Sequence, residues 1–185
     1  PPIPMLFMGE EWAEERPFLF FTDFAGELGR NVREGRRKEF RKWPQFQDPE
    51  TRARIPDPNA AGTMEASRLD WAAREKESGQ RRLAYVRDLL ALRAREIAPR
   101  IEELRQGSEL IRTLSERAFA VSWPFPDGNV LRCAASFERA PVAAQLEPLN
   151  PTQVLFESEP GLAAHVAEGH FPADAVLFEI GRGRP

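Results

Sequence analysis

Two adjacent carboxylates and a tryptophan are the first residues whose chemistry points to a site: Glu10, Glu11 and Trp12 follow an apolar run over residues 3–8 and Gly9. A carboxylate can transfer protons or accept hydrogen bonds from hydroxyl groups. Neighbouring strand residues point to opposite sides, so at most one of the two acids faces a cleft unless the strand has ended. The alternative is that both acids build the loop after the strand.

Aromatic and polar residues continue this candidate site. Together with Trp12, the rings of Phe18, Phe20 and Phe21 offer flat faces to a sugar, although four aromatic residues in ten positions are more often core. Asp23 either accepts hydrogen bonds from paired hydroxyls or forms a turn after the aromatic run. We predict that Glu10, Glu11, Trp12 and Asp23 contact substrate and that none of them is a catalytic residue.

A basic run lies beside Phe40 and Trp43 and consists of Arg30, Arg33, Arg36, Arg37, Lys38, Arg41 and Lys42. Basic and aromatic residues together can bind single-stranded nucleic acid. The net charge of −3 and the interspersed acids Glu27, Glu34 and Glu39 instead favour a solvated helix face, and we predict no nucleic-acid partner. On such a helix Arg36 or Arg37 could still reach a substrate cleft.

Metal and membrane signatures are weak in this sequence. His165 and His170 are five residues apart without a paired cysteine, which is a poor metal signature, and we predict neither a metal nor a cofactor. Cys133 is the single cysteine, so an intrachain disulfide is impossible. No run approaches the ~20 apolar residues of a membrane span, and the start lacks a signal-peptide pattern. We therefore expect a cytoplasmic protein and no membrane partner.

The first part of the chain must position the acids. Residues 3–8 predict a strand buried on both faces, because apolar residues occupy consecutive positions. A helix is predicted within 26–42, and four prolines in 44–63 predict an ordered excursion or a loop; we call residues 44–63 the excursion. Residues 79–98 show the clearest helical periodicity, ending before Pro99, which opens a second short helix to Gln106.

The character changes after Gly107. Short apolar or alternating runs separated by turn signals predict strands over 118–123, 129–136, 142–146, 154–157 and 175–180. This spacing is typical of a small antiparallel β-sandwich or barrel. We therefore divide the chain into residues 1–105 and an all-β domain over residues 106–185.

The motif Pro4-Met5-Leu6-Phe7-Met8-Gly9-Glu10-Glu11-Trp12 resembles the eighth barrel strand of α-amylase superfamily enzymes. The segments that follow occur in the order seen in maltooligosyltrehalose trehalohydrolases: 17–23, 34–40, 55–58, 67–71 and the helix segment 85–93. The resemblance covers about residues 1–97. One departure is Phe24, which stands where the family pattern has histidine after Thr22-Asp23.

The resemblance implies both a fold and an activity. The fold is α+β: the last β/α unit of a (β/α)8 TIM barrel with a long loop excursion, then a C-terminal antiparallel β-sandwich. The activity is retaining hydrolysis of the α-1,4 bond next to the trehalose end of maltooligosyltrehalose or a related α-glucan. The family's catalytic carboxylates lie on earlier strands, so the partner of this segment is the N-terminal part of the same enzyme, and the segment alone is expected to be inactive. The alternative is a non-catalytic interaction or glycan-contact module.

Overall fold

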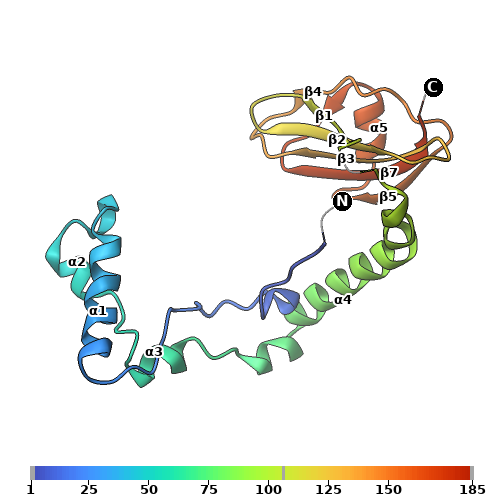
Figure 1. The fold of residues 1–185 in the computed structure, drawn as a ribbon. Helices are drawn as coiled ribbons and strands as arrows, with labels where there is room; N and C mark the ends of the chain where they lie inside the picture. Colours follow the sequence, from blue (N-terminus) through green and yellow to red (C-terminus); the bar gives the residue numbers. More distant parts are fainter. Residues whose placement is uncertain (1–2, 106, 184–185) are drawn as a thin grey trace. The chain divides into compact units, whose positions relative to one another are not determined.

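The computed structural model describes residues 3–105 and 107–183. Contacts divide the chain into two compact units: one is Pro4–Arg87, and the other comprises Ile3 with the described residues from Asp88 on. We call them the helical unit and the β unit (Figure 1). The dividing point falls inside helix α4, whereas the sequence prediction placed a domain boundary after residue 105; that boundary stays a prediction.

The helical unit contains short helices joined by extended segments. Its elements are η1 (Glu10–Trp12), α1 (Gly26–Phe40), η2 (Pro44–Phe46), α2 (Pro49–Ala53), α3 (Ala61–Ala66), η3 (Trp71–Glu75) and most of α4 (Glu77–Leu92). The helix predicted within 26–42 is therefore present. Of the two alternatives for 44–63, the structure has an ordered excursion and not a plain loop, because η2, α2 and the start of α3 lie there. Pro44 and Pro49 each stand in the first turn of a helix, where a missing N–H removes no hydrogen bond.

The apolar run at residues 3–8 is extended but is not part of a strand. Ile3 is 86% exposed and Met5 is 93% exposed, so the predicted burial on both faces is not observed. A strand needs a hydrogen-bonding neighbour, and none of the strand pairs in the described part of the chain includes this segment. The barrel strand therefore stays a proposal.

Helix α4 continues without a break into one segment that is wound more widely than an α-helix and a second that is wound more tightly. It is followed by a π-helical turn, η4 (Arg93–Ile97), and a 3-10 helix, η5 (Ala98–Glu103). The second short helix predicted from Pro99 is thus observed as η5, with Pro99 in its first turn. Its predicted last residue, Gln106, lies outside the described residues.

The β unit is built on antiparallel strands. They are β1 (Leu110–Thr113), β2 (Ala118–Pro124), β3 (Asn129–Ser136), β4 (Val142–Ala143), β5 (Thr152–Glu157), β6 (His170–Phe171) and β7 (Ala175–Arg182), with helix α5 (Leu162–Ala167). One sheet has the order β1-β2-β3-β7-β5, and β4 pairs with β6. The predicted class, α+β with an antiparallel sheet, is confirmed, while a sandwich stays a prediction.

Two clusters of buried side chains cover the two faces of the five-stranded sheet. On one face Ala134 and Leu177 pack with Leu162 and Val166 of α5 and with Phe171. On the other face Leu131 and Ile180 pack with Phe125, and Ile97 and Leu104 of the η4–η5 region lie against them. Successive strand residues point to opposite faces, so the alternation of β3 and β7 supplies both clusters.

Candidate functional site

The two predicted acids lie in a tight turn that begins at Gly9. Gly9 is buried with a φ of 94°, and a Cβ there would lie 2.6 Å from the Cβ of Glu14, so only glycine fits this position. The backbone N–H of Phe7 donates to Oε2 of Glu10 at 2.7 Å, and that of Gly9 donates to Oε2 of Glu11 at 2.9 Å. Both carboxylates therefore stabilise the turn in which they lie. In each of them the second oxygen, Oε1, takes no part in these two hydrogen bonds.

Glu10, but not Glu11, lines a cavity of about 420 Å³ in the helical unit. The other lining residues include Glu14, Arg16, Arg82 and the ring of Phe18. Backbone N–H groups hold the pKa of Glu14 below its ordinary value, first that of Arg16 and then that of Asp70. The cavity thus combines carboxylates, guanidinium groups and an aromatic ring, the groups that contact the hydroxyls and the C–H faces of sugars.

Sequence reasoning missed Glu14. Its carboxylate accepts from the backbone N–H of Arg16 at 3.0 Å and from that of Asp70 at 2.6 Å, so it ties this turn to a segment 56 residues further on. The chain turns back at Gly9, where the backbone N–H of Glu14 donates to the Gly9 carbonyl at 2.9 Å. A glycine followed by several acids was the available signal, but their spacing alone did not show which of these acids line the cavity.

Trp12 and Asp23 are placed differently from these acids. Trp12 is 7% exposed, and its ring centroid lies 5.2 Å from that of Trp71, so this tryptophan packs in the interior of the helical unit. Asp23 is exposed immediately before α1. The structure therefore does not bring Trp12 or Asp23 into the cavity that Glu10 lines.

Arg36 lines a second cavity of about 320 Å³, together with Phe20, Phe40, Phe46 and Arg54. Its guanidinium carbon lies 5.1 Å from the ring centroid of Phe20 and 4.5 Å from that of Phe40, close enough for cation–π attraction. The cavity therefore has aromatic walls with a cation between them, so Arg36 does not stand alone in solvent.

Arg37 is not among the residues that line the second cavity. The backbone N–H of Asn59, then Arg33 and to a lesser degree Arg37, hold the pKa of Asp57 below its ordinary value. Asn59 in turn accepts from Thr22 Oγ1 at 2.8 Å and donates to the Gly29 carbonyl at 3.0 Å. The excursion is thus fastened to the start of α1 by specific polar contacts.

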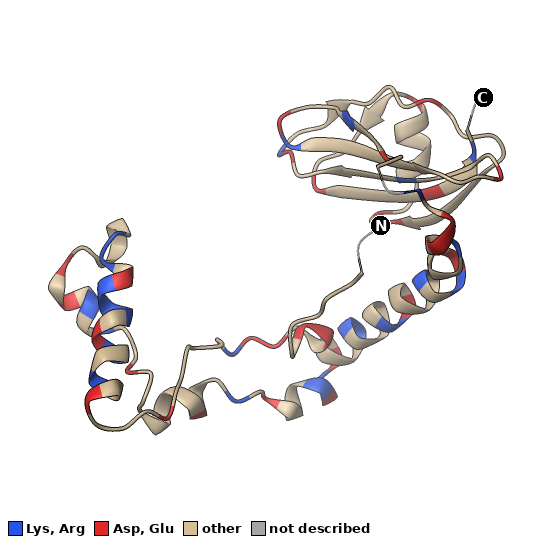
Figure 2. Cartoon of the chain, in the orientation of Figure 1, with Lys and Arg blue, Asp and Glu red and all other residues tan. Residues whose placement is uncertain are grey.

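The basic run has the interspersed charges expected of a solvated helix face (Figure 2). Arg33 pairs with Asp57 at 3.2 Å, and Arg36 pairs with Glu39 at 3.0 Å. Partly exposed pairs like these contribute little stability, but each offsets one positive charge of α1.

The described residues include neither a cluster of metal ligands nor a membrane-spanning helix. Within residues 3–105 and 107–183, no group of three or more histidine, cysteine, aspartate or glutamate side chains is arranged to hold a metal ion. His165 and His170 are both exposed. None of the helices in those ranges has the length and the apolar character needed to cross a membrane.

Comparisons with known proteins connect both units to carbohydrate enzymes. A family model described as a domain of unknown function, DUF3459, matches residues 107–178. The chain is 48% identical over 93 residues to a malto-oligosyltrehalose trehalohydrolase of Deinococcus radiodurans, a match covering 50% of this chain and 15% of that protein. It is 42% identical over 72 residues to the enzyme of the same name from Saccharolobus solfataricus, covering 38% of this chain and 11% of that protein.

A solved structure extends the match over most of the chain. A candidate α-amylase from Salmonella typhimurium has a TM-score of 0.82 and 36% identity, and the match covers 97% of this chain and 28% of that one. The chain therefore spans less than a third of the length of the relatives it matches. It is a relative of the malto-oligosyltrehalose trehalohydrolases and corresponds to the C-terminal part of such proteins.

Proposed function

We propose that this chain is a segment of a retaining glycoside hydrolase that cleaves the α-1,4 bond next to the trehalose end of maltooligosyltrehalose and so releases trehalose. The observation that carries this proposal is the 48% identity over 93 residues to a protein of that name. The order of motifs from Pro4 to residue 93 supports it. The substrate partner is then maltooligosyltrehalose or a related α-glucan, and the cellular setting is the cytoplasm.

The catalytic carboxylates of this enzyme lie outside the segment. Retaining hydrolysis uses a nucleophile and an acid whose carboxyl groups are ~5–5.5 Å apart. Glu10 and Glu11 instead accept hydrogen bonds from their own turn, which suits a supporting role. On this proposal residues 1–105 complete a (β/α)8 barrel begun by the N-terminal part of the enzyme, and residues 106–185 form the β-sandwich that follows it in the chain.

The proposed contribution of this segment is to bind substrate. Glu10 and Glu11 stand at the turn where the barrel strand would end, and Arg36 with the rings around it supplies a second contact region. Asp23, Trp12 and Arg37 are retained as candidate substrate residues; Trp12 would act by holding the turn, because it is buried. No metal or organic cofactor takes part in this chemistry.

The product tests the proposed reaction. The intact enzyme is incubated with maltooligosyltrehalose and with a linear maltooligosaccharide of equal length, and the sugars released are separated and identified. We expect trehalose and a shortened maltooligosaccharide from the first substrate. Maltose or glucose from the linear substrate, without trehalose from the other, would overturn the proposal in favour of a different α-glucan hydrolase.

The acids are tested in the same enzyme. Glu11→Gln is expected to lower kcat/KM at least about tenfold, since losing one preorganised contact costs ~2–4 kcal/mol. Glutamine keeps an acceptor for the Gly9 N–H, so the turn persists and the loss reports on the carboxylate charge. Glu10→Gln is the matched control and should cost less. If Glu10→Gln loses most of its activity while Glu11→Gln stays near normal, the assignment is reversed. The position of Glu10 in the cavity lining is compatible with that result.

A further inference from the structure

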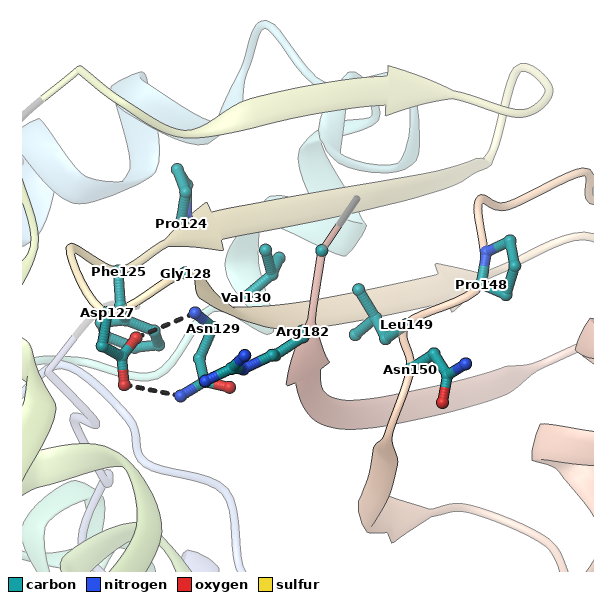
Figure 3. Close-up of a pocket in the computed structure, with 11 residues that line it drawn as sticks. Pro124, Phe125, Asp127, Gly128, Asn129, Val130, Pro148, Leu149, Asn150 and Arg182 are labelled. Carbon is teal, nitrogen blue, oxygen red and sulfur yellow. Dashed lines mark hydrogen bonds between the residues drawn. The ribbon is translucent and has the colours of Figure 1, made fainter. Parts of the chain in front are cut away.

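A pocket of about 810 Å³ lies on the β unit (Figure 3). Three separate segments line it: the turn between β2 and β3, the end of β7 at Arg182, and the loop over residues 148–150. Its volume is within the ~300–1,000 Å³ typical of small-ligand sites. Nothing in the proposed trehalose-releasing reaction uses this pocket.

The polar side chains of the pocket include both charges and both kinds of hydrogen-bonding group. Asp127 and Arg182 carry opposite charges, while Asn129 and Asn150 each supply an amide donor and acceptor. The carboxylate of Asp127 accepts from the backbone N–H of Asn129 at 2.8 Å and from its side-chain amide at 2.5 Å, as Figure 3 shows. The charges of the lining side chains, one carboxylate and one guanidinium, balance, and Arg100 near Asp127 lies outside the lining.

The remaining lining is apolar. Phe125 is 7% exposed and Leu149 is 9% exposed, and they line the pocket together with Pro124, Val130 and Pro148. A pyranose ring presents apolar C–H groups on its faces and hydroxyls around its rim, so it needs both surfaces at once. Pairs of planar polar groups suit adjacent hydroxyls because one side chain can donate or accept twice.

Backbone hydrogen bonds hold the three segments in place before any ligand arrives. Phe125 N–H donates to the Asn129 carbonyl at 2.8 Å, and Gly183 N–H donates to the Gly128 carbonyl at 3.3 Å. Asn150 N–H donates to the Arg182 carbonyl at 2.9 Å. A site built on segments tied in this way loses little conformational freedom on binding, which favours affinity for a weakly interacting ligand.

We propose that this pocket binds a neutral oligosaccharide, with Asp127, Asn129 and Arg182 contacting ring hydroxyls and the Leu149–Pro148 side receiving the C–H face. The ligand is an α-1,4-glucan if the proposed function holds, since the β unit would then retain the chain whose end is cut elsewhere. The pocket is a non-catalytic binding site, and its occupancy does not require the rest of the enzyme.

The test is a binding titration of the 185-residue chain with maltoheptaose, followed by 1H–15N NMR. We expect saturable shifts centred on residues 125–130, 148–150 and 181–183. Arg182→Gln, which keeps the backbone bonds of β7, should weaken binding at least about tenfold, the size of losing one hydrogen bond to a charged group. Arg112→Gln, on the exposed edge strand β1, is the matched control and should bind normally.

Other outcomes separate the two proposals. The pocket assignment is overturned if maltoheptaose gives no saturable shifts or if Arg182→Gln and Arg112→Gln bind it equally. It is also overturned if inorganic phosphate gives shifts that maltoheptaose does not compete away. Equal binding of cellopentaose would overturn the α-glucan specificity and leave a general oligosaccharide site. Trehalose release is measured separately in the intact enzyme, so a failed titration does not bear on that reaction.

Discussion

The buried ion pair between Arg132 and Glu179 gives the sharpest stability prediction for the β unit. These residues are register partners on β3 and β7, and they are only 7% and 6% exposed. Arg132 Nε donates to Glu179 Oε1 at 2.6 Å, Nη2 donates to the same oxygen, and Nη1 donates to the Glu147 carbonyl at 2.6 Å. The guanidinium therefore holds two strands and the loop before β5 together.

Removing one partner should cost far more than removing both. Arg132→Met leaves the carboxylate of Glu179 buried without its cation, which costs ~3–5 kcal/mol. The Glu147 carbonyl also loses its donor, adding ~1 kcal/mol. The double variant Arg132→Met/Glu179→Leu removes both charges, which lie near the apolar side chain of Leu146. Such replacements of a buried ion pair are often neutral or stabilising by ~1–4 kcal/mol.

Native-state hydrogen exchange on peptides covering β3 and β7 measures these effects in the β unit alone. The opening free energy of those peptides should fall by ~4–6 kcal/mol in Arg132→Met, the sum of the two losses above, or reach the limit set by global stability. It should recover most of that loss in the double variant. The reasoning is refuted if the single variant loses less than ~1 kcal/mol, or if the double variant is as unstable as the single one.

Two further predictions concern Asn59 in the helical unit and Cys133 in β3. Asn59→Ala removes the acceptor of Thr22 Oγ1 and of the Phe24 N–H and the donor to the Gly29 carbonyl, so peptides covering residues 22–29 should exchange faster; Asn59→Asp, which keeps the acceptor, should lie in between. Unchanged exchange in both variants would show that these contacts do not fasten the excursion. Burial raises the pKa of the Cys133 thiol from 9.0 to about 11, so alkylation at pH 8 should be ~100-fold slower in the folded chain than in urea. Between those pKa values the unfolded chain binds fewer protons than the folded one, so stability should fall as pH rises, and equal alkylation rates would contradict the burial argument.

Periodic segments were the part of the fold that the sequence could predict. Strand β3 was expected over 129–136 and has those bounds, because its alternation places Leu131 on one face and Ala134 on the other. Strand β1 was missed since its four residues are all exposed and show no pattern of burial. Helix α5 was missed since six residues are too few to establish a helical period.

The apolar run at residues 3–8 shows the opposite limit. Consecutive apolar residues such as Ile3 and Met5 predict burial, but burial needs partners that a segment cannot specify by itself. The candidate site has the same limit. Glu10 and Glu11 were chosen because they are acids that follow an apolar run. The position of Glu14 instead depends on the turn at Gly9, which has a positive φ. Candidate residues could be chosen from the sequence, but the sequence did not show which of them lie together in the cavity.

The place of β7 in the sheet has a consequence for the order in which the β unit acquires structure. β7 follows every other strand along the chain, yet it lies between β3 and β5 and pairs with both. During synthesis the β1-β2-β3 meander can therefore form early from local pairings, while β5 waits without a neighbour until Arg182 has left the ribosome. A chain stopped before Ala175 would leave the inner edge of β3 open to pairing with another molecule. The last strand of this sheet to be made is thus the one that joins β5 to β3 and covers the open edge of β3.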